Sequence, residues 1–173
     1  MRDLTEVRDL DEAFTRFVAD HGDRAVRLAY VTLRDRHEAD DIGQEALVRL
    51  WRHAQRHGAD TLSAALLYRT VVNLCRDHAR HRHRHPEDAT DPGLVTAVSP
   101  SSDREQAMAI LAAVQELAPM ERQVIMLFYY LDQSLRETAE VMGLSEQLVK
   151  TRLFRARQHL KPLLEPIMRE EVT

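Results

Sequence analysis

Apolar residues recur at helical spacing over most of the chain. Between residues 38 and 53, Ala39, Ile42, Ala46 and Leu50 follow one another every four positions or so. That spacing places side chains on one face of an α-helix. The N-terminal half is predicted to form helices over residues 10–21, 23–33, 38–53 and 62–83. Neither a strand-rich segment nor an internal repeat is evident, so the expected fold class is all-α.

The helical pattern is interrupted between residues 85 and 103. This stretch, HPEDATDPGLVTAVSPSSD, contains Pro86, Pro92, Pro100 and Gly93 and shows no sustained helical period. Proline and glycine at this density are typical of a linker. We therefore expect two small helical domains, over residues 10–85 and 104–165, joined by a flexible linker over residues 86–103.

A helix–turn–helix pattern lies in the C-terminal half. The apolar run Val124–Leu131 resembles a buried strand in composition, but it continues a helical pattern that begins at Pro119, a favourable first-turn residue. Ser134 and Glu137 have capping-box spacing, which marks the start of another helix. Gly143 suits a left-handed turn at the end of that helix, and Ser145 can cap the next one.

The last of these helices has two distinct faces. Its predicted buried stripe contains Val149, Leu153, Ala156, Leu160 and Leu164. The exposed face carries hydrogen-bonding and apolar groups near its N-terminal tip, with cations around them: Gln147, Leu148, Lys150, Thr151, Arg152 and Arg155. Such a helix fits the DNA major groove, where base edges meet the tip and phosphates meet the cations. Similar helix pairs also occur in proteins that bind no DNA.

Charge is unevenly distributed along the chain. The whole sequence of 173 residues has a formal net charge of -4, yet residues 51–85 carry 7 basic and 2 acidic side chains, and residues 148–173 carry 6 and 3. Each block alone is compatible with an ordinary solvated surface. Two segregated basic blocks favour contact with nucleic acid.

Other kinds of site find little support in the sequence. The tract from His78 to His85 alternates histidine with arginine, and that positive charge favours a basic tail over a metal site. Cys75 is the single cysteine, and we expect an inert, partly buried thiol. No Gly-rich phosphate loop, catalytic triad or convincing metal-ligand spacing is present, so no enzyme activity, cofactor or metal is expected. The charged N-terminus and the lack of a long apolar run favour a cytoplasmic location.

Two segments together carry a family resemblance. The stretch LAPMERQVIMLFYYLDQSLRETAEVMGLSEQLVKTRLFRARQHL is similar to region 4 of group IV, or extracytoplasmic-function, sigma factors. EADDIGQEALVRLW and LLYRTVVNLCRDHARHRHR resemble the region 2 segments that dock on RNA polymerase and meet the promoter -10 element. The resemblance covers about residues 11–164, in family order.

The resemblance implies a bacterial sigma factor that directs core RNA polymerase to promoters and aids their opening. The implied polymerase-binding residues are Asp40, Asp41, Gln44 and Glu45. The implied contacts to the -10 element are Arg69, Asn73, Arg76, Arg80, Arg82 and Arg84, and those to the -35 element are the six residues of the exposed helix face given above. Core polymerase, promoter DNA and an anti-sigma factor are the implied partners.

Two departures and two alternatives accompany this resemblance. The family usually has Trp at the position of Leu66 and Thr at that of Leu148, so promoter preference does not transfer. Residues 56–61 are either a pocket for a flipped base or a simple connector.

The alternatives to a sigma factor are a stand-alone helix–turn–helix regulator and a metal-responsive enzyme or sensor built on the His/Cys tract.

Overall fold

The computed structural model describes residues 4–84 and 102–170. These ranges form helices α1 (Leu4–Leu33), α2 (Arg36–His57), η1 (Ala59–Thr61), α3 (Ala64–Arg84), α4 (Ser102–Gln115), α5 (Pro119–Ile125), η3 (Met126–Tyr130), α6 (Leu135–Met142) and α7 (Glu146–Glu170). No strand occurs in them, which confirms the all-α prediction. Nearly all of the linker expected over residues 86–103 lies outside the described residues.

The long helix α1 differs from the prediction of two helices over residues 10–21 and 23–33. It runs without a break through Gly22, which is buried in the helix interior. A glycine costs a helix only about 1 kcal/mol relative to alanine, so packing along the rest of α1 outweighs it. The prediction of a break was therefore wrong.

Helix α2 packs closely against α1. A Cβ atom added at Gly43 would lie 2.5 Å from Cγ2 of Val26, so glycine permits the close approach of the two helices there. Asp35 caps α2 by accepting a hydrogen bond from the Glu38 backbone N–H at 3.1 Å. The predicted apolar stripe is buried, and it continues at Ala54.

Helix α3 completes the N-terminal domain. The short helix η1 precedes it, and the Ser63 hydroxyl accepts a hydrogen bond from the Leu66 backbone N–H at 3.1 Å. This cap places the start of α3 two residues later than the expected start at Leu62. Its buried face consists of Leu67, Tyr68, Val71, Val72 and Cys75.

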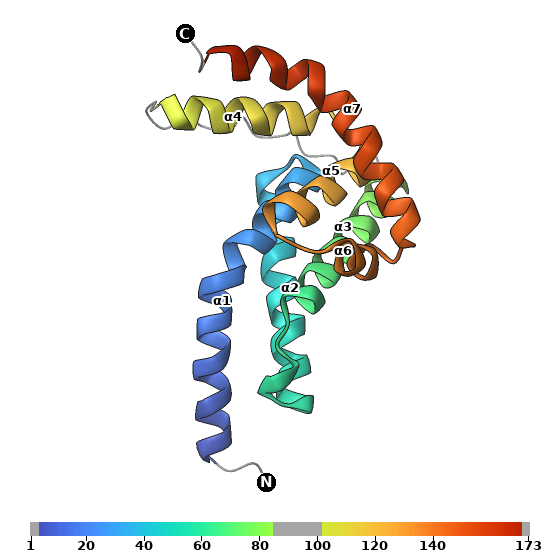
Figure 1. Ribbon diagram of the computed structural model, residues 1–173. Coiled ribbons are helices and arrows are strands. Elements are labelled where there is room, and N and C mark those ends of the chain that lie inside the picture. Colours follow the sequence, from blue (N-terminus) through green and yellow to red (C-terminus); the bar gives the residue numbers. More distant parts are fainter. Residues whose placement is uncertain (1–3, 85–101, 171–173) are drawn as a thin grey trace.

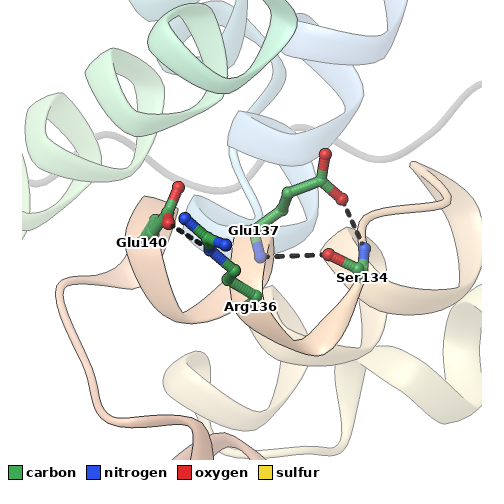
Figure 2. A network of polar contacts seen from close by, with 4 residues as sticks. All are labelled: Ser134, Arg136, Glu137 and Glu140. Atoms are coloured by element: carbon green, nitrogen blue, oxygen red, sulfur yellow. Dashed lines mark hydrogen bonds and ion pairs between the residues drawn. The ribbon is translucent and has the colours of Figure 1, made fainter.

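The C-terminal domain begins with α4 and contains the predicted helix–turn–helix. Pro119 lies in the first turn of α5, and the following segment is a π-helix in which the Leu131 N–H bonds to the Met126 carbonyl at 2.9 Å. The run is therefore helical from Val124 to Tyr130, as expected, and Leu131 is its C-cap. Figure 2 shows the capping box at the start of α6: the Ser134 hydroxyl accepts from the Glu137 N–H, and the Glu137 carboxylate accepts from the Ser134 N–H.

The two domains are in contact (Figure 1). Helix α5 packs on α1, and α6 packs on α3, while α4 lies alongside α7. Hydrogen bonds between described residues also join the two domains. Arg27 donates to the Tyr130 hydroxyl at 2.7 Å, and Arg76 donates to the Met142 carbonyl at 3.3 Å.

Candidate polymerase and nucleic-acid interfaces

The acidic face predicted on α2 is accessible to solvent. Asp41 and Gln44 are exposed, while Asp40 and Glu45 are half-buried. Glu45 accepts a hydrogen bond from Nε of Arg49 at 2.7 Å, so part of its charge is balanced within the helix. Asp41 has no such neighbour among the described ion pairs and keeps its charge available to a partner.

An apolar side chain extends this acidic face. Val48, 40% exposed, lies seven positions after Asp41 and four after Gln44, so the three share one side of α2. Val48 also lines a groove of about 290 Å³ between α1 and α2, where the rings of Phe14 and Trp51 lie 4.8 Å apart. Val48 was not predicted from the sequence, although its helical spacing from Asp41 places it on this face.

Four of the polar residues predicted on α3 lie at its surface. Arg69, Asn73, Arg80 and Arg84 are exposed and follow one another at spacings of four or seven positions, which places them on one side of the helix. Arg80 pairs with Asp77 at 3.5 Å, and Arg84 donates to the Arg80 carbonyl. Exposed pairs of this kind stabilise a helix only weakly, so these cations can exchange them for phosphates.

Three of the predicted α3 cations, Arg69 among them, lie beside the C-terminal domain. Arg76 is half-buried and bonds to the end of α6. Arg69, although exposed, lines a pocket with Arg136 and Glu140 of α6. Arg82 is half-buried beside Gln115 of α4. The structure thus places part of the predicted -10 surface against α4 and α6.

The N-terminal tip of α7 is open. Gly143 adopts the left-handed conformation with φ of 65°, and the Ser145 hydroxyl accepts from the Leu148 N–H at 3.2 Å. Gln147, Leu148, Lys150 and Arg155 are exposed. With Gly143 ending α6 and Ser145 capping α7, the predicted base-reading residues Gln147 and Leu148 lie in solvent.

Other residues on or beside this face differ in how far they are exposed. The Thr151 hydroxyl donates to the Gln147 carbonyl at 3.0 Å, and Arg152 is half-buried. Phe154 is 60% exposed and lies seven positions after Gln147, so it extends the same face. An exposed phenylalanine there can contact a thymine methyl group.

The opposite face of α7 holds the domain together. Val149, Leu153, Ala156 and Leu160 are buried, and Leu164 packs against them while half-buried. Nε of Arg157 donates to the Tyr129 hydroxyl at 2.7 Å, which ties α7 to η3. The predicted division of α7 into a buried and an exposed face is confirmed.

Cys75 and His78 of α3 are involved in packing of the N-terminal domain. Burial raises the pKa of the Cys75 thiol to about 12. Nδ1 of His78 lies 3.1 Å from a Glu38 carboxylate oxygen, which links α3 to α2. Within the described residues, no three His, Cys, Asp or Glu side chains are grouped to hold a metal, and no helix is long and apolar enough to cross a membrane. His85 lies outside them.

Comparison with known proteins identifies the family. The family model for sigma-70 region 2 matches residues 17–85, and that for sigma-70 region 4 matches residues 107–160. The ECF RNA polymerase sigma factor SigM of Mycobacterium tuberculosis is 33% identical over 156 residues, covering 88% of this chain and 77% of that protein. The chain belongs to the extracytoplasmic-function sigma factors of the sigma-70 family. SigW of Bacillus subtilis is 28% identical over 170 residues, covering 90% of this chain and 91% of SigW.

Solved structures agree with this sigma factor in fold. The structure of sigma factor RpoE of Bartonella quintana with anti-sigma factor NepR gives a TM-score of 0.69 at 21% identity, covering 88% of this chain and 96% of that one. CnrH in complex with the cytosolic domain of CnrY gives 0.64 at 27% identity, covering 90% of each chain. A sigma factor directs RNA polymerase in transcription initiation, and the presence of region 2 excludes the stand-alone regulator.

Proposed function

We propose that this sigma factor docks on core RNA polymerase through the α2 face formed by Asp41, Gln44 and Val48, with Asp40 and Glu45 beside it. The accessible carboxylate of Asp41 next to an exposed apolar side chain is the observation that supports this most directly. A central apolar contact with charged groups around it is typical of protein interfaces. Charge at such a surface also guides the encounter with a basic partner.

Promoter contacts are divided between α3 and α7 in this proposal. On α3, Arg69, Asn73, Arg76, Arg80, Arg82 and Arg84 meet the -10 element. On α7, Gln147, Leu148 and Thr151 meet base edges of the -35 element, while Lys150, Arg152 and Arg155 hold phosphates. Residues 56–61 comprise the end of α2, its C-cap Gly58 and η1. This segment precedes α3 and is available to an extruded base during opening.

The remaining features follow from the polymerase as partner. RNA synthesis takes place in the polymerase, so this chain needs no catalytic residue or cofactor of its own. Its place of action is the cytoplasm, where the polymerase and chromosome lie. Because two structurally similar sigma factors were solved with NepR and CnrY, an anti-sigma factor is the expected regulatory partner.

Co-elution with core polymerase in gel filtration tests the docking face. Asp41→Lys and Gln44→Ala should each weaken association by about tenfold or more, since both alter the centre of the interface. Glu116→Lys is the matched control, because Glu116 is exposed at the end of α4 and outside the docking face. Folded Asp41→Lys and Gln44→Ala variants that co-elute as well as the control would refute this assignment.

A further inference from the structure

A pocket of about 500 Å³ lies where the ends of α1, α3 and α4 meet. Its lining residues come from both domains: Tyr30, Leu33, Arg34, Asp35, Arg82 and Gln115. Arg34 and Arg82 bring two guanidinium groups to this site. Arg82 is also among the residues proposed to meet the -10 element, whereas Arg34 and Gln115 belong to none of the proposed interfaces.

Among the described residues that line this pocket, the one acidic side chain already accepts a hydrogen bond. Asp35 is 3% exposed, and its carboxylate accepts the hydrogen bond that caps α2. Among the described ion pairs, neither Arg34 nor Arg82 has a carboxylate partner. The pocket is therefore rich in donors and poor in acceptors.

A buried cation next to the pocket adds to this imbalance. Arg122 is 5% exposed, and its Nη1 donates to Oε1 of Gln115 at 2.9 Å. Neither Nε of Arg122 nor Nε2 of Gln115 has a hydrogen-bond partner within the part of the chain that the structure describes. Burial, and then the nearby charge of Arg34, lowers the pKa of Arg122. Buried cations are normally paired with an anion, and an unpaired one destabilises the fold.

We propose that this pocket binds a phosphate-type anion, held by the guanidinium groups of Arg34 and Arg82 and by the amide of Gln115. Guanidinium groups match phosphate oxygens in geometry and form charge-assisted hydrogen bonds with them. A bound anion also offsets the positive potential of Arg122. Because Arg34 and Gln115 belong to different domains, the anion stabilises the contact between them.

Isothermal titration calorimetry with inorganic phosphate tests the site, with chloride used to keep the ionic strength constant. Wild-type protein should show saturable binding. Arg34→Asn and Arg82→Gln should each raise the Kd by about tenfold, as expected for losing one hydrogen bond to a charged group. Asparagine suits position 34 because Arg34 has a positive φ of 63°. Arg8→Gln is the control, because Arg8 is exposed on α1 far along the chain from the pocket.

A parallel titration with ATP distinguishes the source of the phosphate. Equal Kd values for ATP and inorganic phosphate indicate a site for free phosphate, and a lower Kd for ATP indicates a nucleotide phosphate. Either result supports the proposal if Arg34→Asn also weakens binding of the anion. An absence of saturable binding, or an unchanged Kd in Arg34→Asn with a native circular dichroism spectrum, would overturn it. The assay contains neither polymerase nor DNA, so its outcome is independent of the docking proposal.

Discussion

Arg27 of α1 donates a hydrogen bond to the hydroxyl of Tyr130 in η3, across the contact between the two domains. The bond is 2.7 Å long, and the Arg27 guanidinium carbon lies 5.3 Å from the centre of the Tyr130 ring. The preceding residue, Tyr129, makes the same kind of pair with Arg157 inside the C-terminal domain, at 2.7 Å and 5.6 Å. Two adjacent tyrosines thus hold arginines of two different domains.

The contact between the two domains affects the order in which the protein can bind polymerase and promoter. With the domains together, α6 packs on α3 and engages Arg76, while the docking face of α2 and the tip of α7 remain exposed. The proposed docking on polymerase is therefore possible while the two domains remain in contact, an arrangement that we call closed. The proposed contact of α3 with the -10 element would require α6 to move away from α3.

Tyr130→Phe should shift the protein towards the open arrangement. Loss of one hydrogen bond costs about 1 kcal/mol, which changes the ratio of closed to open molecules by roughly fivefold. Fluorescence transfer between dyes at positions 52 and 158, in a Cys75→Ala background, measures this ratio. Tyr129→Phe is the matched control, because its lost bond lies within one domain. Equal dye separations in the two variants would show that the Arg27–Tyr130 bond does not hold the domains together.

Helix α7 should yield three phenotypes when its faces are mutated separately. Gln147→Ala should alter -35 preference by about 1–3 kcal/mol at one base position, because Gln147 lies at the exposed tip. Arg155→Ala should weaken binding to all sequences and reduce the salt slope by about one unit. Leu153→Ala should destabilise the domain by roughly 2–5 kcal/mol, since Leu153 is buried.

Holoenzyme binding to a library of randomised -35 sequences separates these outcomes. Gln158→Ala is the control, since Gln158 is exposed further along α7. Circular dichroism identifies the variants that have lost their fold. A preference changed by Arg155→Ala and left intact by Gln147→Ala would reverse the assigned roles.

Cys75 should make the stability of the N-terminal domain depend on alkaline pH. Its folded-state pKa is raised from 9.0 to about 12 by burial, so the unfolded chain releases the thiol proton first. The folded state is then disfavoured progressively between about pH 9 and about pH 12, by up to about 1.4 kcal/mol per pH unit. Below pH 8 the thiol does not contribute to the change of folding free energy with pH.

Urea unfolding followed by the fluorescence of Trp51, the single tryptophan, measures this dependence. Cys75→Ala is the reference, because it keeps the other titrating groups and adds only a constant difference in free energy. Between pH 9 and pH 10.5, wild type should lose stability faster than Cys75→Ala. Parallel pH profiles for the two proteins would mean that the thiol ionises freely in the folded state.

Local features of this fold could be predicted from the sequence, whereas contacts between distant residues could not. The capping box at Ser134 and the stripe containing Val149 and Leu153 depend on residues a few positions apart, and the pattern shows them directly. The break predicted at Gly22 was wrong, because a helix tolerates glycine when neighbouring helices pack along it. The Arg27–Tyr130 bond joins residues 103 positions apart, and no local pattern indicates it.

The same distinction applies to the candidate interfaces. The exposure of Asp41 and Gln147 follows from helical spacing, and the structure agrees with it. The partial burial of Arg76 and Arg82 depends on how the C-terminal domain packs against α3, which the sequence of α3 does not specify. Val48 was missed because its spacing from Asp41 places it on that face of α2 but does not show that its side chain is exposed.

Mapping the 5′ ends of transcripts made in vitro tests the central claim most directly. Core polymerase would be supplied with genomic DNA fragments, with and without this chain. The chain should produce defined new start sites that share a -35 and a -10 element, and Asp41→Lys should abolish them while Glu116→Lys retains them. Start sites identical to those of core polymerase alone, or unaffected by Asp41→Lys, would contradict the account.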